Sequence, residues 1–128
     1  MNDADVCEVV ITAPDADWLA EFTRRLVADR LCASGQQVAP IRSHYWWRGE
    51  LHDEQEARVA LHTRASLVPA IIERTRREHP YEVPCVVALP IVVGNPDYLA
   101  WITTETVHSD RKSPPGAEGI ELAGPAGH

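Results

Sequence analysis

Two closely spaced prolines in the stretch His-Pro-Tyr-Glu-Val-Pro, residues 79–84, constrain this chain more than any other feature. Proline fixes φ and biases the residue before it toward extended backbone, so this segment is not expected to be helical. An uninterrupted apolar run follows at 85–91, which is typical of a strand buried on both faces inside a sheet. We therefore expect a rigid corner at the start of an interior strand, carrying three functional side chains, His79, Tyr81 and Glu82.

Hydrophobic periodicity predicts the other elements. Strands are expected at 6–12, 37–47 and 56–63, and helices at 16–33, 66–78 and 96–102. The order strand, helix, strand, strand, helix, strand is that of the ferredoxin-like fold. The sequence therefore predicts an α+β protein, a βαββαβ sandwich with an antiparallel sheet and an added C-terminal helix.

Local signals set the expected ends of these elements. Asp15 and Ser66 are the expected N-caps of the first two helices, and Ser-Gly at 34–35 is expected to end the first. Pro40 predicts a break in the second strand, and Arg-Gly-Glu at 48–50 predicts the turn of a hairpin. Because one arm of this hairpin is long and rich in aromatic residues, we expect it to overhang the domain and to need a partner strand.

Length and composition limit the domain organisation and the partners. A chain of 128 residues suits one domain, predicted at 1–108, followed by a tail at 109–128. The tail is rich in proline, glycine and alanine, so we expect it to be disordered. The net charge of −7 argues against a nucleic-acid partner, which would require a positively charged face.

The sequence also predicts a cytoplasmic protein without a membrane partner. No apolar run approaches the ~20 residues of a membrane span, and residues 1–5 are acidic where a signal peptide would be basic. The three cysteines form no Cys-x-x-Cys pair, which fits free thiols in a reducing compartment.

Several motifs in order along residues 6–107 resemble the CutA divalent-cation-tolerance family. They are Thr-Ala-Pro-Asp at 12–15, Ser-His-Tyr-Trp-Trp-Arg-Gly at 43–49, His-Pro-Tyr-Glu-Val-Pro at 79–84, Leu-Pro-Ile at 89–91 and Tyr-Leu-Ala-Trp-Ile at 98–102. The histidine-proline-tyrosine-glutamate stretch with the downstream leucine-proline pair is the specific part of this resemblance.

The resemblance implies a ferredoxin-like homotrimer with a small polar site near the subunit interfaces. It also implies a role in tolerance of divalent metal ions, copper especially, without a defined reaction. Several positions depart from the family pattern, residues 31–34, 39–40 and 62 among them. Ile11 stands where bacterial members proposed to bind copper have a cysteine, and Cys85 stands where the family usually has a glutamate. The fold and trimer are also similar to those of PII signalling proteins, which bind small effectors between subunits.

The predicted metal ligands are His79, Glu82 and Cys85. Imidazole, carboxylate and thiolate groups bind copper or zinc, and the thiolate favours Cu(I). Their odd spacing sends successive side chains of an extended chain to opposite faces, so a site also requires a ligand from another subunit or from the hairpin. His44 and His62 are a further candidate pair across the hairpin. The alternative is that His79 and Glu82 form hydrogen bonds with backbone groups at the corner.

A second hypothesis is an effector site between subunits. Its expected lining is Tyr45, Trp47, Tyr81 and Glu82, which offer aromatic surfaces and one negative charge. The alternative is that the aromatic residues of the hairpin form an oligomer interface.

The sequence gives little support for an enzyme. It has no Gly-x-Ser-x-Gly motif and no phosphate-binding glycine loop. Cys85 enters an apolar strand, where burial is expected to raise the pKa of its thiol and make it inert. We therefore expect a binding protein rather than an enzyme, and an enzyme of unassigned chemistry is the third hypothesis.

Overall fold

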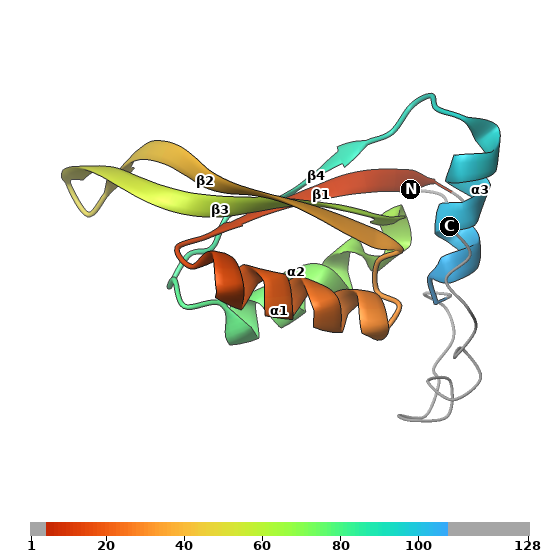
Figure 1. Cartoon of the computed structure of the whole chain (residues 1–128), viewed down its shortest axis with the longest axis horizontal. Coiled ribbons are helices and arrows are strands. Elements are labelled where there is room, and N and C mark those ends of the chain that lie inside the picture. Colours follow the sequence, from red (N-terminus) through yellow and green to blue (C-terminus); the bar gives the residue numbers. More distant parts are fainter. Residues whose placement is uncertain (1–4, 108–128) are drawn as a thin grey trace.

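The computed structural model describes residues 5–107, which form a four-stranded antiparallel sheet and three α-helices (Figure 1). In chain order the elements are β1 (Val6–Ala13), α1 (Ala16–Ala28), β2 (Ser34–Trp47), β3 (Glu50–Arg64), a 3₁₀ turn (Ala65–Leu67), α2 (Val68–Glu78), β4 (Val86–Pro90) and α3 (Pro96–Glu105). The strand order β2-β3-β1-β4 confirms the predicted ferredoxin-like α+β fold with an added helix. The predicted tail at 109–128 lies outside the described residues.

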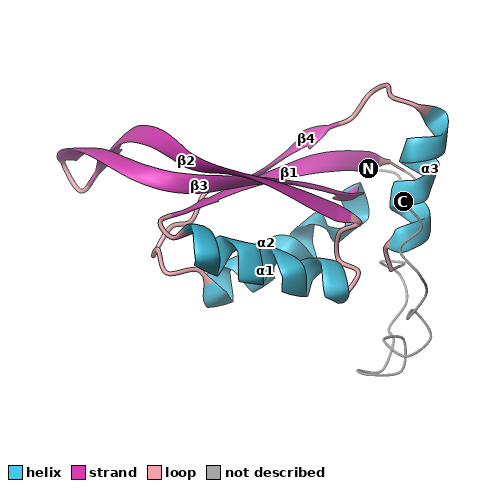
Figure 2. Ribbon diagram, viewed as in Figure 1, coloured by secondary structure: helices cyan, strands magenta, loops and turns pink. Residues whose placement is uncertain are grey.

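The helices leave one face of the sheet open. Helices α1 and α2 lie side by side on one face, and α3 lies at the end of the sheet opposite the turn between β2 and β3 (Figure 2). The β2–β3 hairpin extends past the helical layer, as the sequence predicted. No helix within residues 5–107 has the length and apolarity that a membrane crossing requires.

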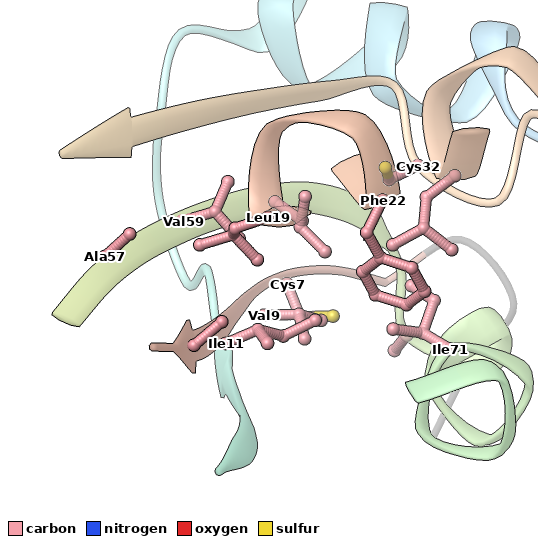
Figure 3. Close-up of a cluster of buried hydrophobic side chains, with 13 residues drawn as sticks. Cys7, Val9, Ile11, Leu19, Phe22, Cys32, Ala57, Val59 and Ile71 are labelled. Carbon is pink, nitrogen blue, oxygen red and sulfur yellow. The ribbon is translucent and has the colours of Figure 1, made fainter. Parts of the chain in front are cut away.

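The core lies between the sheet and the two helices on its covered face. Alternate residues of β1 point toward the helices, because successive strand side chains face opposite sides. Figure 3 shows them meeting side chains from β3, α1 and α2. Its labelled residues are Cys7, Val9, Ile11, Leu19, Phe22, Cys32, Ala57, Val59 and Ile71.

Helix α1 ends five residues earlier than predicted. Its Asp15 N-cap is confirmed, since the side chain accepts a hydrogen bond from the Asp17 amide. At the other end Arg30 adopts a positive φ of 60°, and the Leu31 amide donates to the Leu26 carbonyl. This is the Schellman arrangement, which usually has glycine at the left-handed position. The end of α1 could not be predicted from the sequence, because arginine occupies the position where glycine would signal it.

The hairpin is longer than predicted. Strand β3 begins at Glu50 instead of residue 56, because its polar first half is paired along β2 although it lacks apolar alternation. The two-residue turn has positive φ at Arg48 and Gly49, which suits the twist of a tight hairpin. The predicted break near Pro40 is confirmed by a shift in register between Val38 and Ile41.

The start of the second helix differs from the prediction. Ser66 lies within the 3₁₀ turn, and α2 begins at Val68 without a side-chain cap. Pro69 lies in the first turn as predicted, where its missing N–H breaks no hydrogen bond. The 3₁₀ turn therefore replaces the expected serine cap.

Strand β4 is an edge strand, so the prediction of an interior strand is wrong. Within the described part of the chain it pairs only with β1, and Val87 and Leu89 are each about half exposed. An apolar run signals burial but does not distinguish burial within one chain from burial against another copy. The apolar surface of β4 is therefore open in the single chain.

Gly35 of β2 lies in close contact with α1. A Cβ atom at this position would lie 2.5 Å from Thr23 Cγ2 and 3.0 Å from Leu61 Cδ2. We expect Gly35→Ala to lower the free energy of unfolding by about 1–3 kcal/mol through overpacking, measured by urea unfolding. The double variant Thr23→Ser/Gly35→Ala removes the clashing methyl group and should recover part of the loss relative to Thr23→Ser alone. An unchanged midpoint for Gly35→Ala would contradict the close packing.

Candidate functional site

A groove of about 720 Å³ lies where the base of the hairpin meets the corner that follows α2. Its walls come from the end of β1, the second half of β2, the middle of β3 and the segment 80–85. The lining residues are Thr12, Ser43, His44, Tyr45, Trp46, Trp47, Glu56, Pro80, Tyr81, Glu82, Val83 and Cys85. The groove therefore combines aromatic surfaces with two carboxylates and a thiol.

His79 holds the corner against the end of β1. Its Nδ1 accepts a hydrogen bond from the Tyr81 amide at 2.9 Å, and its Nε2 lies 2.7 Å from the Thr12 carbonyl oxygen. Since an amide only donates and a carbonyl only accepts, Nδ1 is unprotonated and Nε2 carries the hydrogen. Burial lowers the pKa of His79, opposed by the Thr12 carbonyl and the Glu56 carboxylate. The imidazole is therefore a neutral bridge between two backbone groups.

Tyr81 and Glu56 form a hydrogen bond in the groove. The Tyr81 hydroxyl donates to Glu56 Oε2 at 3.0 Å, and Glu56 is only 7% exposed. Burial raises the pKa of Tyr81, and the Glu56 carboxylate and the Tyr45 phenol raise it further. Tyr81 is therefore a protonated donor at neutral pH, and it satisfies one oxygen of a buried carboxylate.

A second carboxylate lies at the mouth of the groove. Arg48 Nη2 lies 2.6 Å from Glu82 Oε1, and both side chains are about two-thirds exposed. The same guanidinium lies over the ring of Trp47, with 5.1 Å between Cζ and the ring centroid. Across the hairpin Tyr45 stacks on His52 at 5.1 Å, which orients the Tyr45 ring.

The four residues predicted to line an effector site lie together. Tyr45, Trp47, Tyr81 and Glu82 all line this groove. The sequence analysis did not identify Glu56, because its hydrogen-bond donor, Tyr81, lies in a distant segment of the chain. Its only local signal is its position at the start of the predicted strand.

The predicted metal ligands have different surroundings. Glu82 and Cys85 line the groove, whereas both ring nitrogens of His79 are engaged by backbone groups behind it. Ligation by His79 would require the loss of one of these two hydrogen bonds. Within residues 5–107, no three His, Cys, Asp or Glu side chains form a group that could hold a metal ion. A metal at the groove would therefore need a ligand from outside this part of the chain.

The two hairpin histidines do not meet. His44 lies opposite Asp53 in the ladder, and His62 lies opposite Ser34 near the other end of the sheet. His62 forms hydrogen bonds with Tyr98 at 2.6 Å and with Glu8 at 2.9 Å. The expected pairing of these histidines is therefore wrong, because the length of the hairpin separates them.

The cysteines are free thiols, as predicted. Burial raises the pKa of Cys7 to about 11 and that of Cys32 to about 12, so both thiols are unreactive at neutral pH. Cys85 is exposed, so the prediction that it is buried is wrong. It precedes β4, whose edge position leaves this part of the chain open.

Comparison with known proteins establishes the family. The model of the CutA1 divalent ion tolerance protein family matches residues 7–105. This chain belongs to the CutA1 family. The Protein CutA of Mus musculus is 39% identical over 104 residues, covering 80% of this chain and 59% of the mouse protein. The divalent-cation tolerance protein CutA of Thermus thermophilus is 38% identical over 98 residues, covering 77% of this chain and 95% of the relative.

Solved CutA structures are also similar. The Thermus thermophilus protein has a TM-score of 0.77 and 36% identity, with 80% of this chain and 99% of that chain covered. CutA1 from Oryza sativa has a TM-score of 0.78 and 33% identity, with 85% of this chain and 96% of the rice chain covered. The chain spans slightly under three-fifths of the length of the mouse and human CutA proteins, 59% and 58% respectively. The family and the Thermus thermophilus relative are named for divalent-ion tolerance, and neither name is that of an enzyme.

The neutral state of His79 predicts a pH effect on stability. Its folded-state pKa is below the ordinary value of 6.5, so the unfolded chain takes up the proton first. The stabilisation is therefore complete above the ordinary pKa and is lost as pH falls through the lowered folded-state pKa. We expect the stability advantage of wild type over His79→Gln to shrink between pH 8 and pH 5 in urea unfolding. An advantage that stays constant or grows on acidification would contradict a neutral bridge, since the two proteins share their other ionisable groups.

Proposed function

We propose that this CutA1 family member acts in divalent-cation tolerance as a cytoplasmic homotrimer that binds copper or another divalent ion weakly, without catalysing a reaction. The observation that carries the proposal is the groove, where Glu82 and Cys85 lie on one wall beside the buried Glu56. Thiolate and carboxylate ligands bind transition metals, and the thiolate favours Cu(I). The neighbouring subunit would complete the ligand set, and His79 would join it only by releasing a backbone group.

A second candidate function is that of a sensor similar to PII proteins. All four residues predicted to line an effector site meet in the groove, which has the volume of a small-molecule pocket. Aromatic side chains give the apolar contact that holds such a ligand, and Glu82 and the Tyr81–Glu56 pair offer polar groups. This candidate differs from the first in needing no metal.

The open apolar surface supports the trimer. Strands β2 and β4 are the free edges of the sheet, and an exposed apolar edge favours pairing with another chain. Large apolar side chains exposed on the strands of the described chain are Val38, Trp46, Trp47, Leu51, Val87 and Leu89. Burying this surface between copies would exclude it from water and place part of the groove near an interface.

The cytoplasmic location is part of the same proposal. It is supported by two buried cysteines that remain free thiols. The names of relatives point to several compartments, since a rice relative is called chloroplastic and an Archaeoglobus fulgidus structure is called periplasmic. Fractionation with an antibody against the native protein would test it.

The trimer predicts a solution mass of three times that of one chain. Light scattering coupled to size exclusion measures this mass directly, and dilution should leave it unchanged. The same mass is expected for Cys85→Ser, because the assembly does not depend on a disulfide through the exposed thiol. A wild-type monomer would contradict the trimer and remove any site shared between subunits.

The metal proposal predicts a loss of Cu(I) affinity when a groove ligand is changed. We expect Cys85→Ser and Glu82→Gln each to weaken binding by at least about tenfold, since even residues that only orient a ligand commonly contribute that much. Competition with a Cu(I) chelator under reducing conditions measures the affinity. Glu73→Gln, an exposed carboxylate on α2, is the matched control. Wild-type affinity in both groove variants would show that these ligands are wrong.

A further inference from the structure

The groove is negatively charged and aromatic at the same time. Two of its lining residues are carboxylates, Glu56 and Glu82, and among residues 5–107 no lysine or arginine lines it. The one lining histidine, His44, lies 3.4 Å from the Asp53 carboxylate. Four lining residues carry aromatic rings: Tyr45, Trp46, Trp47 and Tyr81. Aromatic faces beside carboxylates attract organic cations, because the ring face and the carboxylate both have a negative electrostatic potential.

The protein already places one of its own cations against this surface. The Arg48 guanidinium lies 5.1 Å from the Trp47 ring centroid and 2.6 Å from Glu82. Trp47 and Glu82 are both lining residues, whereas Arg48 reaches them from the turn. Arg48 therefore makes, within one chain, the two contacts that a bound organic cation would make, one with an aromatic ring and one with a carboxylate.

The Arg48 contact is easily displaced. Both partners are 67% exposed, and exposed ion pairs of this kind contribute little because water and salt screen them. Arg48 lies in the turn between β2 and β3, outside both strands, so moving its side chain away from Glu82 requires no change in the sheet. A ligand cation would then replace the guanidinium at the same two groups.

We propose that the groove binds a small organic cation, an amine with an apolar body, and that Arg48 competes for its position. This inference rests on the second candidate function, for which it names the ligand class. The ammonium group would contact Glu82 at the mouth of the groove, where the Arg48 guanidinium lies, and the apolar body would lie against the aromatic walls. Glu56, which is only 7% exposed and therefore poorly screened, adds to the negative potential deeper in the groove.

Tyr81 fixes the geometry of the deeper carboxylate. Its hydroxyl donates to Oε2 of Glu56, which holds this carboxylate in one orientation. Tyr81 keeps its proton, because burial and the carboxylate both raise its pKa. The Tyr81–Glu56 pair therefore carries a net negative charge that a cation can neutralise and that repels an anion.

Benzylamine, benzyl alcohol and benzoate test the charge preference, since they have similar bodies and are cationic, neutral and anionic at pH 7. Calorimetric titration of the full chain measures their affinities. We expect wild type to bind benzylamine about tenfold more tightly than benzyl alcohol and to bind benzoate more weakly than either. Glu56→Gln and Glu82→Gln should reduce this preference, with thermal unfolding confirming the fold of each variant. Glu73→Gln is the control, and Arg48→Gln should tighten benzylamine binding about two- to fivefold.

The possible outcomes separate the two levels of the proposal. If all three probes bind equally, and Trp47→Leu weakens them equally, the groove is a ligand site but the cation preference is wrong. If no probe binds, or if binding is unaffected by Trp47→Leu, the assignment of the groove as an effector site is wrong. An unchanged benzylamine affinity in Arg48→Gln would overturn the competition by Arg48.

Discussion

The two hydrogen bonds of His79 are the interaction on which the groove depends. One imidazole joins the Tyr81 amide to the Thr12 carbonyl, and so fixes the proline-containing corner to the end of β1. With the corner fixed, Tyr81 reaches across to Glu56 on β3 and closes one side of the groove. The prolines restrict the backbone locally, and the histidine joins the corner to the end of β1.

The groove combines negative charge with apolar aromatic surface, and these two properties favour different ligands. Carboxylates and an exposed thiol suit a metal ion, whereas aromatic rings beside the carboxylates suit an organic cation. Both ligands are cations, which fits the overall charge of −7. A hydrated metal ion gains little from the rings, and an amine gains little from the thiol, so substitutions at Trp47 and Cys85 distinguish them.

The element order was predictable because each element has its own hydrophobic periodicity. The four residues proposed from the family motifs to line one site, Tyr45, Trp47, Tyr81 and Glu82, all line the groove. The errors arose where a non-local or unusual contact decides the structure. Arg30 ends α1 in a conformation usually given to glycine, and the apolar run of β4 lies at an edge. The partner of His79 is a backbone carbonyl, which no side-chain pattern encodes. Glu56 is buried by contacts from a distant corner, so its local sequence gives no sign of its role.

The most direct measurement is the protonation state of the His79 ring, read from the nitrogen resonances of ¹⁵N-labelled protein at pH 7. A neutral ring with the hydrogen on Nε2 is predicted, because Nδ1 accepts from the Tyr81 amide and Nε2 donates to the Thr12 carbonyl. A charged ring, or a hydrogen on Nδ1, would contradict the bridge. The bridge between the corner and the end of β1 would then be absent, and the account of how the groove is held in place would be wrong.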